Sequence, residues 1–263
     1  MSIADELIDA RQRRTYVTAP TQRDGAFSLS DGYAVAEEVA KRWQDAGHRR
    51  AGIKIGLTNE AVWERLGITA PVWGPIYRDN LVDATTATGS DPVSFPIAPC
   101  VAPRIEAEVI VELSAELGPG AGLDTVASSI GWAALGFEFV DCHYENWVLQ
   151  PPDLVADFGA HAGLVIGPPA VLTPAELLAL DTFPIELHAD GSVTCSGSGD
   201  RVVGGPLRAI AAVLAAPHAP VLPAGTLIST GALTGGAHPV VAPQRWDIAP
   251  GRRQLAAVSV RTV

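Results

Sequence analysis

From about residue 91 to the end of the chain, short runs of strand-forming residues are separated by proline and glycine. Apolar runs of this length, bounded by turn-forming residues, favour β-strands. The expected strands are Glu106–Leu113, Trp132–Val140, Ala162–Ile166, Ile185–Ala189, Leu227–Thr230 and Leu255–Val260. Helical patterns interrupt them at Leu123–Ser129, Pro174–Leu180 and Pro206–Ala215. The pattern predicts an α+β fold with a large mixed sheet or a sandwich.

The first part of the chain has a mainly helical pattern. Ala4–Arg14 is expected to form a short helix. A second helix is expected to begin at Leu29–Asp31, where serine and aspartate supply an N-cap. We therefore expect an N-terminal helical subdomain, residues 1–90, followed by a mixed β domain, residues 91–263.

Two other stretches lie near the end of this helical part. Ala51–Leu57 alternates like a short strand bounded by glycine, with Lys54 on the face opposite to its two isoleucine neighbours. Pro71–Tyr77 contains two prolines and a glycine among bulky apolar side chains, so we expect it to be an ordered loop.

The composition of the chain limits its partners. With 263 residues, of which 48% are hydrophobic, it can bury a substantial core. Its net charge of −11 argues against nucleic acid as a partner, because phosphate binding depends on clustered lysine and arginine. An acidic protein with an anionic substrate must concentrate positive charge locally, and a bound cation can provide it. Lys41 and Lys54 are the only lysines, so few ammonium groups are available for proton transfer.

The cysteines and the N-terminus indicate the compartment. Cys100, Cys142 and Cys195 are far apart and form no Cys-x-x-Cys pair, which argues against a disulfide framework or a thiolate zinc site. Met1–Arg14 lacks the apolar stretch of a signal peptide, and no apolar run approaches the roughly 18 residues of a membrane span. We expect a cytoplasmic protein with no membrane partner.

Acidic residues recur at alternate positions in the otherwise apolar run Arg104–Leu113. Strand geometry puts Glu106 and Glu108 on one face, with Glu112 as a further candidate, and apolar side chains on the other face. Two adjacent carboxylates in a half-buried strand repel each other, so they require a compensating cation or a solvated face. This segment alone does not decide between the two.

A third glutamate lies in the strand-like run Gly136–His143. Glu138 is flanked by two phenylalanines, which argues against a place on the surface. Together with Glu106 and Glu108, it would make an all-oxygen site. Such a site suits Mg²⁺ or Mn²⁺ better than zinc.

Several sequence blocks together carry a family resemblance. They are Lys54–Thr58, the Glu106-x-Glu108 strand, Glu138–Asp141 and Gly225–Gly235, supported by Leu29–Tyr33 and the turn Gly197–Pro206. In this order, over nearly the whole chain, they resemble the 2-keto-4-pentenoate hydratase and 4-oxalocrotonate decarboxylase group. That group belongs to the fumarylacetoacetate hydrolase superfamily.

The resemblance implies a mixed β-sandwich or roll with an N-terminal helical portion, and metal ligation by Glu106, Glu108 and Glu138. It also implies a homo-oligomer, with a related pathway enzyme as a second candidate partner. The substrates would be small 2-oxo or 2-hydroxy-dienoate acids. Asp157–His161 departs from the Asp-Asn-Ala-Ser-Ser type of sequence found in many members. This departure bears on the substrate more than on the metal site.

The implied activity is that of a lyase. A metal-dependent hydratase would add water to a 2-hydroxy-2,4-dienoate to give a 4-hydroxy-2-oxo acid, with the metal stabilising an enolate. The same metal site would serve a decarboxylase of a 4-oxalocrotonate-like acid, so the motif does not choose between the two reactions. Two further functions stay open. They are an acylpyruvate-type C–C hydrolase, for which no His–Glu dyad is evident in the sequence, and a silent partner subunit of a related decarboxylase.

Five further residues are candidates for catalysis or substrate binding. Lys54 would transfer protons, because the pKa of a desolvated lysine beside a metal can be lowered towards neutrality, or it would form an ordinary salt bridge with a glutamate. Asp141 would orient a ligand or a bound water, or cap its strand. His161 would act as acid or base, or be structural. Leu57 and Thr234 would bind substrate, Thr234 by donating a hydrogen bond to a carboxylate beside closely approaching glycines.

Overall fold

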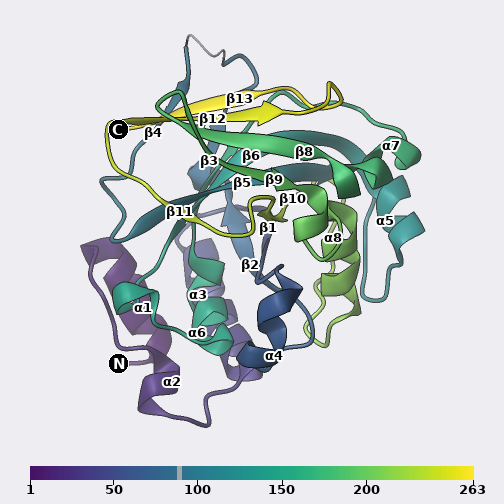
Figure 1. The fold of residues 1–263 in the computed structure, drawn as a ribbon. Coiled ribbons are helices and arrows are strands. Elements are labelled where there is room, and N and C mark those ends of the chain that lie inside the picture. Colours follow the sequence, from purple (N-terminus) through teal and green to yellow (C-terminus); the bar gives the residue numbers. More distant parts are fainter. Residues whose placement is uncertain (88–90) are drawn as a thin grey trace.

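The structure is a computed structural model that describes residues 1–87 and 91–263, arranged as two β-sheets with helices around them (Figure 1). The larger sheet has the strand order β2-β1-β10-β5-β6-β7-β3, and β11 pairs with β5. Its strands are β1 (Arg50–Gly56), β2 (Val72–Tyr77), β3 (Leu81–Asp83), β5 (Pro103–Leu113), β6 (Ile130–Asp141), β7 (His161–Ile166), β10 (Leu227–Ala232) and β11 (His238–Pro239).

The smaller sheet has the strand order β4-β13-β12-β8-β9. Its strands are β4 (Val93–Phe95), β8 (Pro184–Ala189), β9 (Ser192–Ser198), β12 (Gln244–Pro250) and β13 (Val258–Thr262). In Figure 1 this sheet lies across one side of the larger one, and the N-terminal helices lie on the other side.

The helices are mostly short. They are α1 (Ile3–Arg13), α2 (Pro20–Arg23), α3 (Leu29–Asp45), α4 (Trp63–Leu66), α5 (Leu123–Ser129), α6 (Pro151–Ala156), α7 (Pro174–Leu178) and α8 (Pro206–Ala215), with two 3₁₀ turns important below, η3 (Glu145–Trp147) and η4 (Phe158–Ala160). Among the described residues, no helix combines the length and apolar character required to cross a membrane.

The main core lies between the two sheets. Alternate residues of β5 contribute to it, Ile105 and Val109 among them, and Leu187 of β8 and Ile248 of β12 come from the smaller sheet. A second apolar cluster joins α1, α3 and α6 to β2 and to Val140 of β6. Because both faces of the larger sheet are covered, polar side chains on its middle strands are buried.

The predicted strands and helices are largely confirmed. Every strand predicted beyond residue 91 overlaps an observed one, although the last begins at Val258 instead of Leu255, and the three predicted helices overlap α5, α7 and α8. Helices and two packed sheets confirm the α+β class.

Two local predictions are wrong. The N-cap of α3 is Ser28, whose side chain accepts a hydrogen bond from the backbone N–H of Asp31. Pro71–Tyr77 is not a loop, because Val72–Tyr77 forms strand β2, antiparallel to β1. Since β2 lies at the edge of the sheet, it bonds on one side only, and an edge strand tolerates a proline that lacks the N–H.

Strands from both sides of residue 90 pair in the larger sheet. β1 lies between β2 and β10, and β3 pairs with β7. The predicted boundary between residues 1–90 and 91–263 falls at residues 88–90, outside the described part of the chain, and this division stays a prediction.

Candidate metal site and substrate cavity

The pairing of β5 with β6 brings the three predicted glutamates together. Glu106 lies directly opposite Glu138, and Glu108 lies opposite Gly136. One carboxylate oxygen from each glutamate can be chosen so that all three lie within 4.8 Å of one another. Gly136 leaves room for the neighbouring Ile110 side chain, since a Cβ atom at position 136 would lie 2.1 Å from it. The structure therefore brings all three predicted ligands to one point.

Two of these carboxylates have one oxygen held and one oxygen free. Ser229 donates to Glu108 Oε2 at 2.5 Å, and the backbone N–H of Gly231 donates to the same atom at 2.9 Å. Lys54 Nζ and His161 Nδ1 both lie 2.9 Å from Glu138 Oε1. Glu108 Oε1 and Glu138 Oε2 are buried without a hydrogen-bond partner among the described residues. Buried carboxylate oxygens without a partner, in a group of three glutamates this close together, fit a divalent cation with oxygen ligands.

The electrostatics of the three carboxylates also fit a cation. Burial raises the pKa of Glu106 to about 7, with Lys54 opposing and Glu138 adding to the rise. Burial raises the pKa of Glu108 well above its ordinary value, and both neighbouring glutamates add to the rise. The pKa of Glu138 is lowered, because Lys54 and His161 outweigh the effect of burial. A divalent cation would stabilise the charged forms of all three groups.

Lys54 comes from β1, on the other side of β10 from the glutamates. Its ammonium contacts Glu138 Oε1 and donates to the backbone carbonyl of Gly159 at 3.0 Å. Burial lowers the pKa of Lys54, but the three glutamates outweigh burial and raise it. Without a metal ion, the carboxylates stabilise the ammonium more than desolvation destabilises it. The predicted lowering concerns a lysine beside a bound metal and stays a prediction.

The segment that supplies the Gly159 carbonyl has an uncommon backbone. Phe158, Gly159 and Ala160 all have positive φ, at 56°, 65° and 59°. A Cβ atom at Gly159 would lie 2.6 Å from Lys54 Cδ, so the lysine stem requires glycine there. Arg11 of α1 holds the segment, donating to the Asp157 carbonyl at 2.8 Å, to Asp157 Oδ1 at 2.7 Å and to the His161 carbonyl at 3.3 Å.

A cavity of about 210 Å³ lies beside the glutamates. Its lining residues are Ile55, Gly56, Leu57, Thr58, Asn59, Val62, Glu106, Ala232, Gly235 and Gly236. The predicted substrate residue Leu57 is thus at the cavity. Thr234 is next to two lining glycines, and its hydroxyl donates to the Gly236 carbonyl at 3.1 Å.

The chain is similar to several known proteins, although no family model matches it. It is 34% identical, over 88% of its length, to a 2-keto-4-pentenoate hydratase from Paraburkholderia phymatum, and it covers 86% of that protein. The chain belongs to the 2-keto-4-pentenoate hydratase and 4-oxalocrotonate decarboxylase family. The resemblance predicted from the sequence is confirmed.

Other members of this family extend the match over the whole chain. A 4-oxalocrotonate decarboxylase from Pseudomonas putida is 27% identical over 100% of this chain and 96% of its own. The solved structure of 4-oxalocrotonate decarboxylase from Pseudomonas putida G7, complexed with magnesium and adipate, is 27% identical to this chain and matches it with a TM-score of 0.88. The match covers 99% of this chain and 95% of the decarboxylase. Fumarylpyruvate hydrolase from Pseudomonas aeruginosa, in complex with Mn²⁺ and pyruvate, shares the fold, with a TM-score of 0.57 and 17% identity. This match covers 82% of this chain and 89% of the hydrolase.

Asp141 and His161 occupy different surroundings in this family member. Asp141 accepts hydrogen bonds from the backbone N–H groups of Val101 and Ala102, which matches the predicted capping role. His161 is buried against Glu138, and its Nε2 has no partner among the described residues. This His–Glu contact was not evident from the sequence. It joins two strands, β6 and β7, and uses a glutamate that also contacts Lys54.

Several site residues were not predicted at all. Ser229 and Gly231 lie within a glycine-rich block whose sequence gives no sign that it touches Glu108. Arg11 lies almost 150 residues before the segment that it holds, and no spacing pattern links them. These contacts result from tertiary packing.

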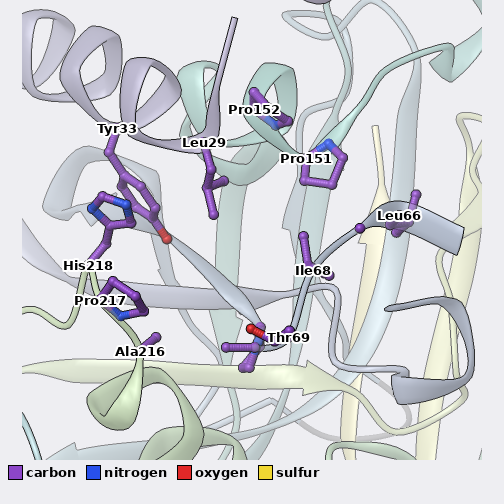
Figure 2. Close-up of a pocket in the computed structure, with 13 residues that line it drawn as sticks. Leu29, Tyr33, Leu66, Ile68, Thr69, Pro151, Pro152, Ala216, Pro217 and His218 are labelled. Carbon is purple, nitrogen blue, oxygen red and sulfur yellow. The ribbon is translucent and has the colours of Figure 1, made fainter. Parts of the chain in front are cut away.

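A separate cavity of about 280 Å³ lies between the start of α3, the segment that follows α4 and the start of α6 (Figure 2). The stacked rings of Tyr33 and His218, with centroids 4.5 Å apart, line one side of it. Its lining includes none of the residues predicted for the metal or the substrate. The cavity beside Glu106, which does include predicted residues, is therefore the candidate substrate cavity.

Proposed function

We propose that this chain is a divalent-metal-dependent lyase that adds water to a 2-hydroxy-2,4-dienoate, giving a 4-hydroxy-2-oxo acid. The observation that carries the proposal is the convergence of three glutamates beside Lys54 and a cavity, with Glu108 and Glu138 buried and each keeping one free oxygen. The family includes enzymes named for this reaction, among them the hydratase from Paraburkholderia phymatum.

Glu106, Glu108 and Glu138 would hold the ion, Mg²⁺ or Mn²⁺. When bound, it would supply Lewis-acid stabilisation of the negative charge that develops on the 2-oxygen of the substrate. Ser229 and Gly231 fix Glu108, so this ligand keeps its orientation. Water and substrate oxygens would supply the remaining ligands of the ion.

Lys54 is the proposed proton donor to the substrate carbon chain. Its ammonium is held between Glu138 and the Gly159 carbonyl, so the donor proton has a defined place. His161 Nε2, buried and free, is the proposed acceptor of a proton from the water that adds. Leu57 would contact the substrate from the cavity wall, and Thr234 from its place next to the lining Gly235. Asp141 would hold the backbone at Val101 and Ala102.

Decarboxylation of a 4-oxalocrotonate-like acid is the second candidate. It is favoured by the 99% coverage and TM-score of 0.88 against the decarboxylase from Pseudomonas putida G7. Acylpyruvate-type hydrolysis is less well supported, because the glutamate that contacts His161 is also a proposed metal ligand. The complete set of three glutamates and Lys54 argues against a silent partner subunit.

The test is to offer purified protein with Mg²⁺ the two substrates 2-hydroxypenta-2,4-dienoate and 2-oxohex-3-enedioate in parallel. Metal-dependent loss of dienoate absorbance, with formation of a 4-hydroxy-2-oxo acid, is the expected result. Release of carbon dioxide from the enedioate would support the second candidate instead. No reaction with either substrate would overturn the proposed function.

We also propose that the protein forms a homo-oligomer in the cytoplasm, as the family resemblance implies, with a related pathway enzyme as a candidate partner. Size-exclusion chromatography with light scattering tests the first part of this proposal. A monomer at micromolar concentration would contradict it.

A further inference from the structure

A cavity of about 400 Å³ lies where the start of β1 meets the loop that leads into β10. The first residues of β1, Arg78 just after β2, and residues 221–226 line it. None of these residues lines the cavity beside Glu106. Sites for small molecules typically have volumes of about 300–1,000 Å³. The cavity is therefore a second place, apart from the metal site, that can hold a small molecule.

The charge of this cavity is positive. Among the described residues that line it, only two are charged, and both are arginines, Arg50 and Arg78. Arg50 begins β1 and is paired with Tyr77, the last residue of β2, which Arg78 follows directly. In a chain of net charge −11, two positive charges with no acid in the same lining concentrate positive potential at one place. Such a cavity attracts anions.

Neither guanidinium has a carboxylate partner. Within residues 1–87 and 91–263, Arg50 and Arg78 take part in no ion pair. Arg50 donates one hydrogen bond, from Nε to the backbone carbonyl of Gly52 at 3.4 Å. An arginine has five N–H donors, so most of the donors of this side chain are available to a ligand.

Arg50 is held in position by an aromatic ring. Its Cζ atom lies 5.1 Å from the centroid of the Trp73 ring, and Trp73 Nε1 donates to the His218 carbonyl at 2.7 Å, which fixes the ring. Although the Arg50 side chain is exposed, partial burial of its guanidinium lowers its pKa, and Tyr77 and Glu37 offset this effect only in part. A bound anion would supply the compensating charge that these neighbours do not provide.

The presence of two guanidiniums indicates which anion fits. Each guanidinium presents a planar fork of N–H donors that matches two oxygens of a carboxylate or a phosphate. A single carboxylate has only two oxygens, whereas a phosphate group has at least three and carries a charge of about −1.5 to −2 at pH 7.

We propose that this cavity binds a phosphate group, free or as part of a small phosphorylated molecule, with Arg50 and Arg78 donating to its oxygens. In a phosphorylated molecule, the remaining part would lie against the apolar side chain of Val221, which lines the cavity and is 60% exposed. The site shares no residue with the proposed hydratase mechanism.

Titration calorimetry with phenyl phosphate, phenyl sulfate and inorganic phosphate tests this proposal. The purified protein is used without added divalent metal, so that no anion binds through an ion at the three glutamates. Phenyl phosphate should bind with one-to-one stoichiometry and more tightly than phenyl sulfate, which has a similar shape but a single charge. Tighter binding of phenyl phosphate than of inorganic phosphate supports a phosphorylated molecule as the ligand, and equal binding supports free phosphate.

Arg50→Met and Arg78→Met should each weaken phenyl phosphate at least about tenfold, since hydrogen bonds to a charged group contribute this much. Arg50→Lys keeps the charge but loses the planar fork, so its affinity should lie between those of wild type and Arg50→Met. Arg104→Met is the matched control, because Arg104 also stacks on a tryptophan, 4.3 Å from the Trp147 ring, and lies outside this cavity. Since salt screens a distant charge, this control should change the affinity less than about twofold.

The proposal is overturned if phenyl phosphate does not bind the wild-type protein, or if phenyl sulfate binds as tightly. It is also overturned if both Met variants at the cavity bind like wild type, or if Arg104→Met weakens phenyl phosphate as much as they do. A melting curve of each variant shows that a lost affinity is not a lost fold. Because these measurements require neither turnover nor a metal ion, their outcome is independent of the test of the proposed function.

Discussion

Glu108 and Glu138 are both buried, yet different groups hold them in place. Glu108 is fixed by a hydroxyl and a backbone N–H from β10, both neutral donors. Glu138 is fixed by Lys54 and His161, which can carry charge and exchange protons. In the proposed metal site, Glu108 would therefore act as a ligand only, whereas Glu138 would connect the metal to the proposed proton-transfer groups.

Ser229→Ala should weaken Mn²⁺ binding about tenfold, because residues that orient a metal ligand typically contribute ten- to hundredfold to affinity. Calorimetric titration of the purified variant measures this loss. Thr230→Val is the matched control, since the adjacent hydroxyl donates to the Val109 carbonyl instead of a glutamate. Equal affinity in Ser229→Ala and wild type would show that Glu108 needs no support.

Lys54→Met should retain metal binding and lose more than about a hundredfold in turnover, the usual contribution of a positioned acid or base. Metal binding is retained because the glutamates lose only a competing cation. Lys41→Met, at a lysine paired with Asp45 on the exposed side of α3, provides the control. Near-normal turnover would eliminate Lys54 as the proton donor.

For individual residues, the sequence was sufficient to predict the surroundings of those whose neighbours lie on the same strand or on the adjacent one. Alternation within one strand placed Glu106 and Glu108 on one face, and the phenylalanines around Glu138 indicated its burial. The pKa direction of Lys54 was not predictable, because it depends on the balance between burial and three carboxylates that only the folded structure brings within reach.

Among the elements, α1 has the most unexpected role. Its Arg11 bridges to Asp157, with the two side chains 14% and 1% exposed, and it holds both ends of the positive-φ segment. A surface helix thereby determines where the Gly159 carbonyl, and with it the Lys54 ammonium, is located.

Arg11→Met should destabilise the protein by about 3 kcal/mol, because removing one partner of a buried ion pair leaves the other charge uncompensated. Urea denaturation measures the change. Arg13→Met, on the same helix and in an exposed pair with Asp9, should cost less than about 0.5 kcal/mol. Equal stability of the two variants would show that the Arg11 bridge contributes little to folding.

The same bridge should make stability sensitive to acid. Burial raises the pKa of Asp157, but Arg11 and His143 outweigh it and lower the pKa below the ordinary value of 3.8. The stabilisation is therefore complete above about pH 4 and is lost as the pH falls through the lowered pKa. Urea unfolding measured from about pH 6 down to about pH 3 should show that the free energy of unfolding falls less in Asp157→Asn than in the wild-type protein. An unchanged acid loss would exclude Asp157 as the source.

Helices and strands with a clear hydrophobic pattern were predicted, whereas those that depend on their place in the sheet were not. β5 and β6 alternate or run apolar for long enough to be recognised. The β2 segment has the residues of a turn, and it is a strand because it pairs with the exposed edge of β1.

For the whole molecule, the larger sheet connects distant parts of the chain. β1 is parallel to β10, and their residues are about 175 positions apart. The sequence predicted two regions with different secondary structure, but it could not predict that strands from both would share one sheet, since strand order depends on long-range pairing.

A fragment of residues 91–263 should not fold cooperatively on its own. Without β1, the edge of β10 would be unpaired, and β7 would lose β3. Exposed strand edges favour aggregation. Circular dichroism and light scattering of the fragment, with the full chain as control, test this expectation. A soluble fragment with a sharp thermal transition would establish the predicted boundary near residue 90.

The opposition of Glu106 and Glu138 across two central strands means that the folded chain confines mutually repelling charges at its middle. An ion that relieves this repulsion binds the native state and not the unfolded chain, so it raises the melting temperature in proportion to the logarithm of its concentration. The melting curve of this protein should therefore rank divalent ions by affinity before any substrate is known.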